Sequence, residues 1–142
     1  MVHFCEVSIL TEQYQQVIPI TEKIKEAVAD AKIRQGTATV VSKHTTTGIT
    51  VNENLECMLQ DMEDLFNSWI PEEAPYHHAR LLRSYGATAG NPTGHLKSML
   101  SGYHAVFPVQ KGEIVLGGAQ DIFFLEFDGP SQRTYTITVM GE

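Results

Sequence analysis

VFPVQKGEIVLGGAQDIFFLEFDGPSQRTYTITVM, residues 106–140, is the stretch of sequence that decides the fold. Four of its segments are rich in β-branched and aromatic residues, which favour strands: residues 106–109, 113–116, 120–127 and 134–140. Lys111-Gly112 and Asp128-Gly129-Pro130 have the composition of turns. Because strands joined by short turns pair in opposite directions, this part of the chain predicts an antiparallel sheet.

The sequence before this stretch adds strands and helices to that sheet. Residues 2–10, 37–42 and 49–51 predict further strands. Thr21 is a candidate N-cap for a helix whose apolar residues recur at helical spacing, and a longer helix with an apolar face runs from Leu55 to Trp69. An irregular segment, residues 71–94, follows, and Asn91-Pro92 near its end predicts the cap and first position of a short helix. We therefore expect one compact α+β domain, residues 1–142, with two or three helices packed on a mainly antiparallel sheet.

The composition excludes several classes of protein. The chain has 142 residues, 42% of them hydrophobic and 19% charged, which is typical of one globular domain. A net charge of -7 argues against non-specific nucleic-acid binding and against docking on an anionic membrane. Cys5 and Cys57 are too few for a disulfide scaffold. The start of the chain does not have the pattern of a signal peptide, so we expect a soluble cytoplasmic protein.

Six histidines are the first candidates for a functional site. His44 precedes Thr45-Thr46-Thr47-Gly48, a stretch that can offer a metal ligand, hydroxyl groups and backbone N–H groups to a small anion. The alternative is a bend between strands that the histidine caps. A metal site would combine His44, either His77 or His78, and His95 from three distant segments. The alternative is that these histidines only form local hydrogen bonds.

Charged side chains give further candidates. Glu53 is a candidate general base, or a partner that fixes a histidine tautomer, although a carboxylate near a helix start is also common. Lys43, Lys97 and Arg133 are candidates to bind a phosphate group, although each is also typical of a surface charge. Glu126 alternates with apolar neighbours and should face away from their side of the strand.

Taken together, these motifs resemble the YjbQ-like proteins, also called the secondary thiamine-phosphate synthase family. The resemblance covers nearly the whole chain. It rests on the following residues: His44-Thr45-Thr46, residues 49–53, Tyr76 with His78, Asn91 with His95-Leu96-Lys97-Ser98, Gly112, Leu116-Gly117, Gln120, Glu126, Asp128-Gly129-Pro130 and Arg133. Two positions depart from the family pattern. Gly118-Ala119 stand where the family usually has Thr-Trp, and Ser131 stands where it usually has Arg.

The resemblance implies a β-sandwich or barrel-like sheet, assembly as a homotrimer, and a site near the subunit interface. It also implies that His44, His78 and His95 face inward as a site for a divalent metal, zinc or magnesium. The activity ascribed to the family is thiamine phosphate synthesis, which joins a pyrimidine pyrophosphate to a thiazole phosphate.

The first hypothesis is therefore a transferase of this type, acting on a small phosphorylated substrate. His44 and Glu53 are its candidate catalytic residues, and the substrate-binding candidates are Thr46, Lys97, Gln120 and Arg133. The second hypothesis is a metal-dependent hydrolase of a small phosphorylated or acylated compound, with Glu53 as base. The third is a non-catalytic trimeric protein that binds a metal or a small molecule. None of the three requires nucleic acid or a membrane.

Overall fold

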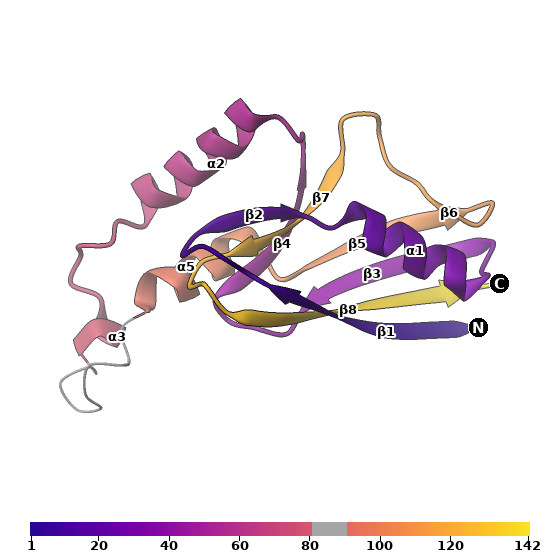
Figure 1. Cartoon of the computed structure of the whole chain (residues 1–142), viewed down its shortest axis with the longest axis horizontal. Coiled ribbons are helices and arrows are strands. Elements are labelled where there is room, and N and C mark those ends of the chain that lie inside the picture. Colours follow the sequence, from indigo (N-terminus) through magenta and orange to yellow (C-terminus); the bar gives the residue numbers. More distant parts are fainter. Residues whose placement is uncertain (81–90) are drawn as a thin grey trace.

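A computed structural model describes residues 1–80 and 91–142 of the chain (Figure 1). Its helices are α1 (Thr21–Ala31), α2 (Glu56–Trp69), α3 (His77–Arg80) and α5 (Pro92–Ser101). Its strands are β1 (Val2–Leu10), β2 (Gln16–Pro19), β3 (Gln35–Ser42), β4 (Thr47–Asn52), β5 (His104–Gln110), β6 (Glu113–Ile114), β7 (Asp121–Glu126) and β8 (Gln132–Gly141). The predicted α+β class is confirmed.

The strands form two antiparallel sheets. One sheet has the order β1-β8-β3-β5-β6 and the other has the order β2-β7-β4. Among the residues that the structure describes, every strand pairing is antiparallel, as the short turns predicted. The turn between β5 and β6 is at Lys111 and Gly112, whose φ angles of 56° and 80° match a tight hairpin turn. Figure 1 shows both termini at one end of the molecule and α3 and α5 at the other.

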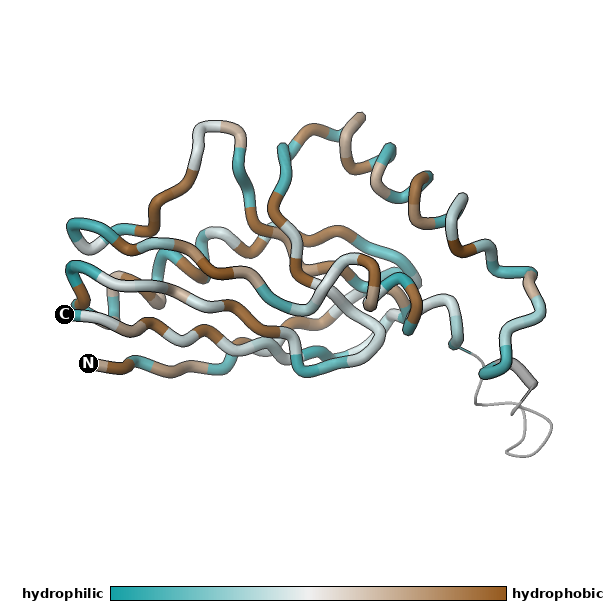
Figure 2. The backbone as a smooth tube through the Cα atoms, turned by 180° about the vertical axis from the view of Figure 1, so that it is seen from behind, coloured by the Kyte–Doolittle hydropathy of each residue, from teal (hydrophilic) through white to brown (hydrophobic). Residues whose placement is uncertain are grey.

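The main core lies between the two sheets and α1. Alternate residues of β8, namely Tyr135, Ile137 and Val139, point into this core, and α1 contributes Ile24 and Val28. Figure 2 shows the resulting alternation of polar and apolar residues along the strands. Period-two burial of this kind fixes which face of each strand lies inward.

A second, smaller core lies between β7 and α2. Met62 of α2 packs there with Phe123 and Leu125 of β7, whereas Ile122 and Phe124 face the main core. Strand β7 is therefore buried on both faces, which explains its uninterrupted apolar run, residues 122–125.

Some details differ from the prediction. Thr21 is the first residue of α1 and not its N-cap; its hydroxyl group bonds to Asp121 and accepts the N–H of Ile122. Leu65 and Trp69 of α2 are exposed, although the helical periodicity grouped them with the packed face. Strand β2 was not predicted. The irregular segment, residues 71–94, contains α3, and its residues 81–90 lie outside the described residues.

Candidate functional site: a pocket lined by histidines

His44 lies in the loop that joins β3 to β4, and its ring is held by a neighbouring strand. The backbone N–H of Thr134 in β8 donates to His44 Nε2 over 2.8 Å. A neutral imidazole that accepts at Nε2 carries its proton on Nδ1. Burial, followed by the positive charge of Arg133, lowers the pKa of His44 below its ordinary value. His44 is therefore neutral at pH 7.

An ion pair between Glu126 and Arg133 lies behind this loop. Arg133 Nε and Nη2 donate to the two carboxylate oxygens of Glu126 at 2.8 and 2.6 Å, and Nη2 also donates to Thr46. Glu126 is completely buried and accepts further hydrogen bonds from Thr11 and from the N–H of Asp128. The partners of Arg133 are therefore groups of the protein itself.

The same contacts determine the charge of Glu126. Its burial alone would raise its pKa, but the hydrogen bonds from Arg133, Thr11 and the Asp128 N–H outweigh burial and hold the pKa below its ordinary value. Glu126 is therefore ionised. It was predicted to face away from its apolar neighbours, but the face it occupies is also buried. The pair joins the end of β7 to the start of β8 and supports the loop of His44.

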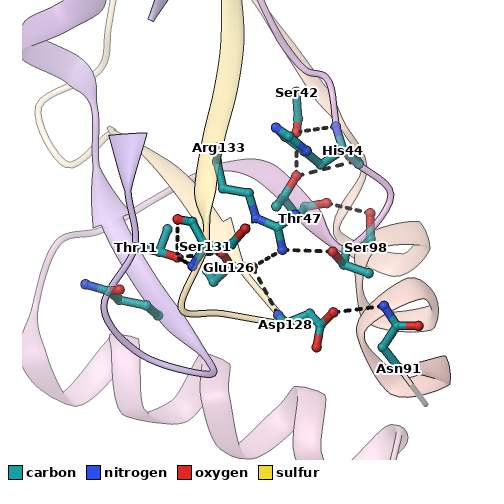
Figure 3. A network of polar contacts seen from close by, with 12 residues as sticks. Thr11, Ser42, His44, Thr47, Asn91, Ser98, Glu126, Asp128, Ser131 and Arg133 are labelled. Atoms are coloured by element: carbon teal, nitrogen blue, oxygen red, sulfur yellow. Dashed lines mark hydrogen bonds and ion pairs between the residues drawn. The ribbon is translucent and has the colours of Figure 1, made fainter. Parts of the chain in front are cut away.

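His95 in α5 is the second histidine of the site, and two side chains orient it. Asn91 Nδ2 donates to Asp128 Oδ2 over 2.8 Å (Figure 3). Since a carboxylate can only accept, the amide of Asn91 must turn its nitrogen toward Asp128. The amide oxygen of Asn91 therefore faces His95 Nε2, 3.2 Å away, and accepts its N–H. The neutral ring of His95 consequently has an unprotonated Nδ1. Asn91 precedes Pro92 as predicted, but its side chain makes this contact and no cap hydrogen bond.

His78 lies beside His95, and the two residues decide whether this part of the molecule could hold a metal ion. The two ring centroids are 5.1 Å apart, and His78 Nδ1 is buried without a hydrogen-bond partner. A buried nitrogen without a partner costs free energy, and His78 and His95 are the two residues here that would hold a metal. Within residues 1–80 and 91–142, however, no group of three or more His, Cys, Asp and Glu side chains could hold a metal ion. The fit is to two imidazoles only.

His44 and His95 line one pocket of about 670 Å³. Its other lining residues are Ser42, Lys43, Thr45, Ser98, Met99, Gly102, Tyr103 and His104. We call this the histidine pocket. The ring centroids of Tyr103 and His104 lie 4.7 Å apart, so two neighbouring aromatic rings belong to the lining of this pocket. Tyr103 carried no sequence signal of function, and Asp128 was predicted only as a turn former.

Lys97, predicted to bind substrate, points elsewhere. Its side chain is 1% exposed, and Nζ donates to Gln15 and to Asn67 over 2.8 Å each, with Glu72 at 3.8 Å. Burial lowers the pKa of Lys97, which Glu72 partly opposes. The lysine therefore ties α5 to α2 and to the loop before β2, and it does not line the histidine pocket.

Glu53 and Gln120 lie away from the histidine pocket. Strand β4 has 6 residues and separates His44 from Glu53, a span of about 20 Å. Gln120 accepts the N–H of Gly117 and lines a separate pocket of about 670 Å³ with Thr21. The predicted pairing of Glu53 or Gln120 with His44 in one site stays a prediction that needs a second chain.

Comparison with known proteins identifies the family. The profile described as "UPF0047 protein YjbQ-like" matches residues 5–142. A UPF0047 protein of Methanothermobacter thermautotrophicus is 33% identical over 96% of this chain and 91% of its own length. UPF0047 protein YugU of Bacillus subtilis is 36% identical over 94% of this chain and 96% of its own length.

Solved structures agree with this assignment. A YbjQ-like protein of unknown function from Sulfolobus solfataricus superposes with a TM-score of 0.92 at 26% identity, covering 100% of this chain and 99% of that one. A YjbQ/UPF0047 family protein from Clostridium acetobutylicum gives a TM-score of 0.86 at 31% identity, covering 96% and 99% of the two chains. Among the described residues, no helix is long and apolar enough to cross a membrane. The chain belongs to the YjbQ-like UPF0047 family.

Proposed function

We propose that this protein is a transferase that acts on a small phosphorylated compound in the histidine pocket. The specific reaction follows the family resemblance: a pyrimidine pyrophosphate and a thiazole phosphate are joined, and pyrophosphate leaves. The observation that carries the proposal is the buried Nδ1 of His78, which has no hydrogen-bond partner beside His95. Proteins rarely leave such an atom unsatisfied, so it points to a bound group at this end of the molecule.

The pocket has little free positive charge to bind a leaving pyrophosphate. Arg133 is neutralised by Glu126, and Lys97 contacts Glu72 outside the pocket. Lys43 is the basic side chain among the lining residues, and it pairs with Glu6 at 3.0 Å. A leaving pyrophosphate therefore needs another source of positive charge. A divalent ion held by His78 and His95 would supply it as a Lewis acid.

The chain's own groups would bind and orient the substrate. Tyr103 and Met99 offer an apolar wall to a heteroaromatic ring, and Ser98 and Thr45 offer hydroxyl groups at the same pocket. A cytoplasmic homotrimer remains our expectation from the resemblance, and a role for Glu53 or Gln120 at this pocket would require another chain to supply the residue.

The test is direct assay of the reaction. The purified protein is incubated with both substrates and Mg²⁺, and thiamine phosphate is measured by chromatography. We expect product from the wild type and from His3→Ala, whose histidine lies on β1, and no product from His44→Ala. Product no greater than that of His44→Ala would contradict the transferase proposal.

A non-catalytic binding protein is the second candidate. The observation that favours it is that Arg133 and Lys97, two predicted substrate-binding cations, are both used inside the fold. This candidate predicts that pyrophosphate or Zn²⁺ raises the melting temperature, because a ligand that binds only the native state stabilises it. It also predicts no turnover. The hydrolase hypothesis depends on Glu53 as its base, and within one chain Glu53 lies at the far end of β4 from His44.

A further inference from the structure

Helix α2 has an apolar stripe that the described part of the fold covers only in part. Met62 and Phe66 of this stripe pack with Phe127 in the smaller core. Leu65 and Trp69 continue the stripe, and they are 48% and 65% exposed. Figure 1 shows α2 at the outer edge of the molecule. A large part of the apolar side of α2 therefore faces solvent.

This exposed part of α2 is one wall of a groove of about 500 Å³, which we call the α2 groove. Residues of β4 and the end of α5 make the other wall, where Leu100 is exposed. The lining residues of α2 fall three or four positions apart, so they form one continuous side of the helix. They include Met58, Met62, Leu65 and Trp69. An apolar groove of this kind, with flexible methionine side chains, suits the apolar side of another helix.

The charge around the α2 groove is negative. Residues 44–79 contain seven acidic residues and neither Lys nor Arg. The acidic residues are Glu53, Glu56, Asp61, Glu63, Asp64, Glu72 and Glu73. Asp61 lines the groove itself and is exposed. Lys97 of α5 points into the fold, where it contacts Asn67. The rim of the groove therefore attracts a positively charged partner.

The longer helices of this chain do not have the complementary surface. The lysines of α1 pair with glutamates of the same helix, and the apolar side of α1 lies in the main core. Helix α2 is acidic, and the lysine of α5 is buried. In the part of the chain that the structure describes, none of these three helices presents an apolar side together with free basic residues. A second copy is therefore a poorer match for the groove than a different protein.

We propose that the α2 groove binds a basic amphipathic helix of a partner protein. The apolar side of that helix lies against Met58, Leu65 and Trp69, and its Lys or Arg residues face Asp61 and the other acidic side chains of α2. The α2 groove and the histidine pocket share no lining residue, so the inference does not depend on the transferase proposal.

The fluorescence of Trp69 reports on the groove, because it is the one tryptophan of the chain. The probe is a synthetic peptide of Leu and Lys, without Trp, whose Leu residues recur at helical spacing. A peptide of the same pattern with Glu in place of Lys is the control for charge. We expect the Lys peptide to shift the emission of Trp69 to shorter wavelength, since it removes the indole ring from water, and the Glu peptide to leave it unchanged. No shift with the Lys peptide, or an equal shift with both peptides, would overturn the proposal.

Two substitutions separate the charged contact from the apolar one. Asp61 and Leu65 lie outside both cores, so Asp61→Lys and Leu65→Ala should fold normally, which circular dichroism checks. We expect Asp61→Lys to weaken binding of the Lys peptide about fivefold or more, and Leu65→Ala about threefold or more. Unchanged binding in both variants would place the peptide elsewhere and overturn the proposal.

The control variant is Glu113→Lys, which makes the same change in net charge on β6, away from α2 (Figure 1). It should bind the Lys peptide within about twofold of the wild type. A loss as large as that of Asp61→Lys would show that net charge alone governs binding, which would overturn the proposal. Dilution of the wild type without peptide should leave the emission of Trp69 unchanged. A shift that depends on protein concentration would show that a second copy fills the groove, and would likewise overturn it.

Discussion

Replacement of Arg133 by Met tests the ion pair that supports the histidine pocket. Arg133 is 8% exposed and Glu126 is 0% exposed, so the substitution leaves a carboxylate buried without its counter-charge. Breaking a buried ion pair in this way costs about 3–5 kcal/mol in the free energy of unfolding. With a urea dependence of about 2 kcal/mol per molar, the midpoint of unfolding should fall by about 2 M.

A double variant removes both charges of the pair. In Glu126→Gln with Arg133→Met, no charge remains, and the amide oxygen can keep one of the two hydrogen bonds from Thr11 and from the N–H of Asp128, because these donors reach different oxygens of Glu126. We expect it to cost about 1–2 kcal/mol, less than Arg133→Met alone. Urea unfolding followed by circular dichroism at one protein concentration measures both, with the exposed Arg34→Met as control. The reasoning is refuted if Arg133→Met shifts the midpoint no further than Arg34→Met does, or if the double variant is the less stable.

Three further predictions use the same unfolding assay. Gly36→Ala should lower the free energy of unfolding by about 3 kcal/mol, because the new Cβ would lie 1.8 Å from the carbonyl oxygen of Met140. Gly118→Ala is the control and should have no effect, because its Cβ meets nothing within 4 Å. Equal effects of the two substitutions would contradict this packing. Lys97→Met should lower the free energy of unfolding by about 1–2 kcal/mol and leave the affinity for pyrophosphate unchanged. A loss of pyrophosphate affinity would show that Lys97 contacts the ligand after all. The pKa of His44 is lower in the native protein than in the unfolded chain, so below about pH 6.5 the unfolded chain binds a proton more readily than the native protein does. The free energy of unfolding should therefore decrease as the pH is lowered through this range. In His44→Gln, the part of this decrease that comes from His44 should be absent.

Much of the fold could be predicted because its signals are local. β-Branched and aromatic composition predicted the strand over residues 134–140, which lies within β8, and the turn residues Lys111-Gly112 predicted the hairpin between β5 and β6. Strand β2 has only 4 residues and includes Pro19, so its pairing with β7 has no comparable signal. The exposure of Leu65 and Trp69 could not be predicted either, because helical periodicity does not show how much of the apolar face of α2 the sheet covers.

The sequence predicted which residues lie at the site better than it predicted what each residue does there. The sequence singled out His44 and His95, and the structure brings them to one pocket. Arg133 was predicted to bind substrate, but its pairing with Glu126 depends on β7 and β8 meeting at their ends. The same holds for the tautomers, since the partner of His44 Nε2 is a backbone amide from residue 134, 90 positions away.

The most direct test of the account is a crystal structure of the protein with Zn²⁺ and pyrophosphate bound. The account predicts pyrophosphate density in the histidine pocket, beside His44 and His95. Thr134 N–H should still donate to His44 Nε2. Pyrophosphate bound away from the histidine pocket would contradict it.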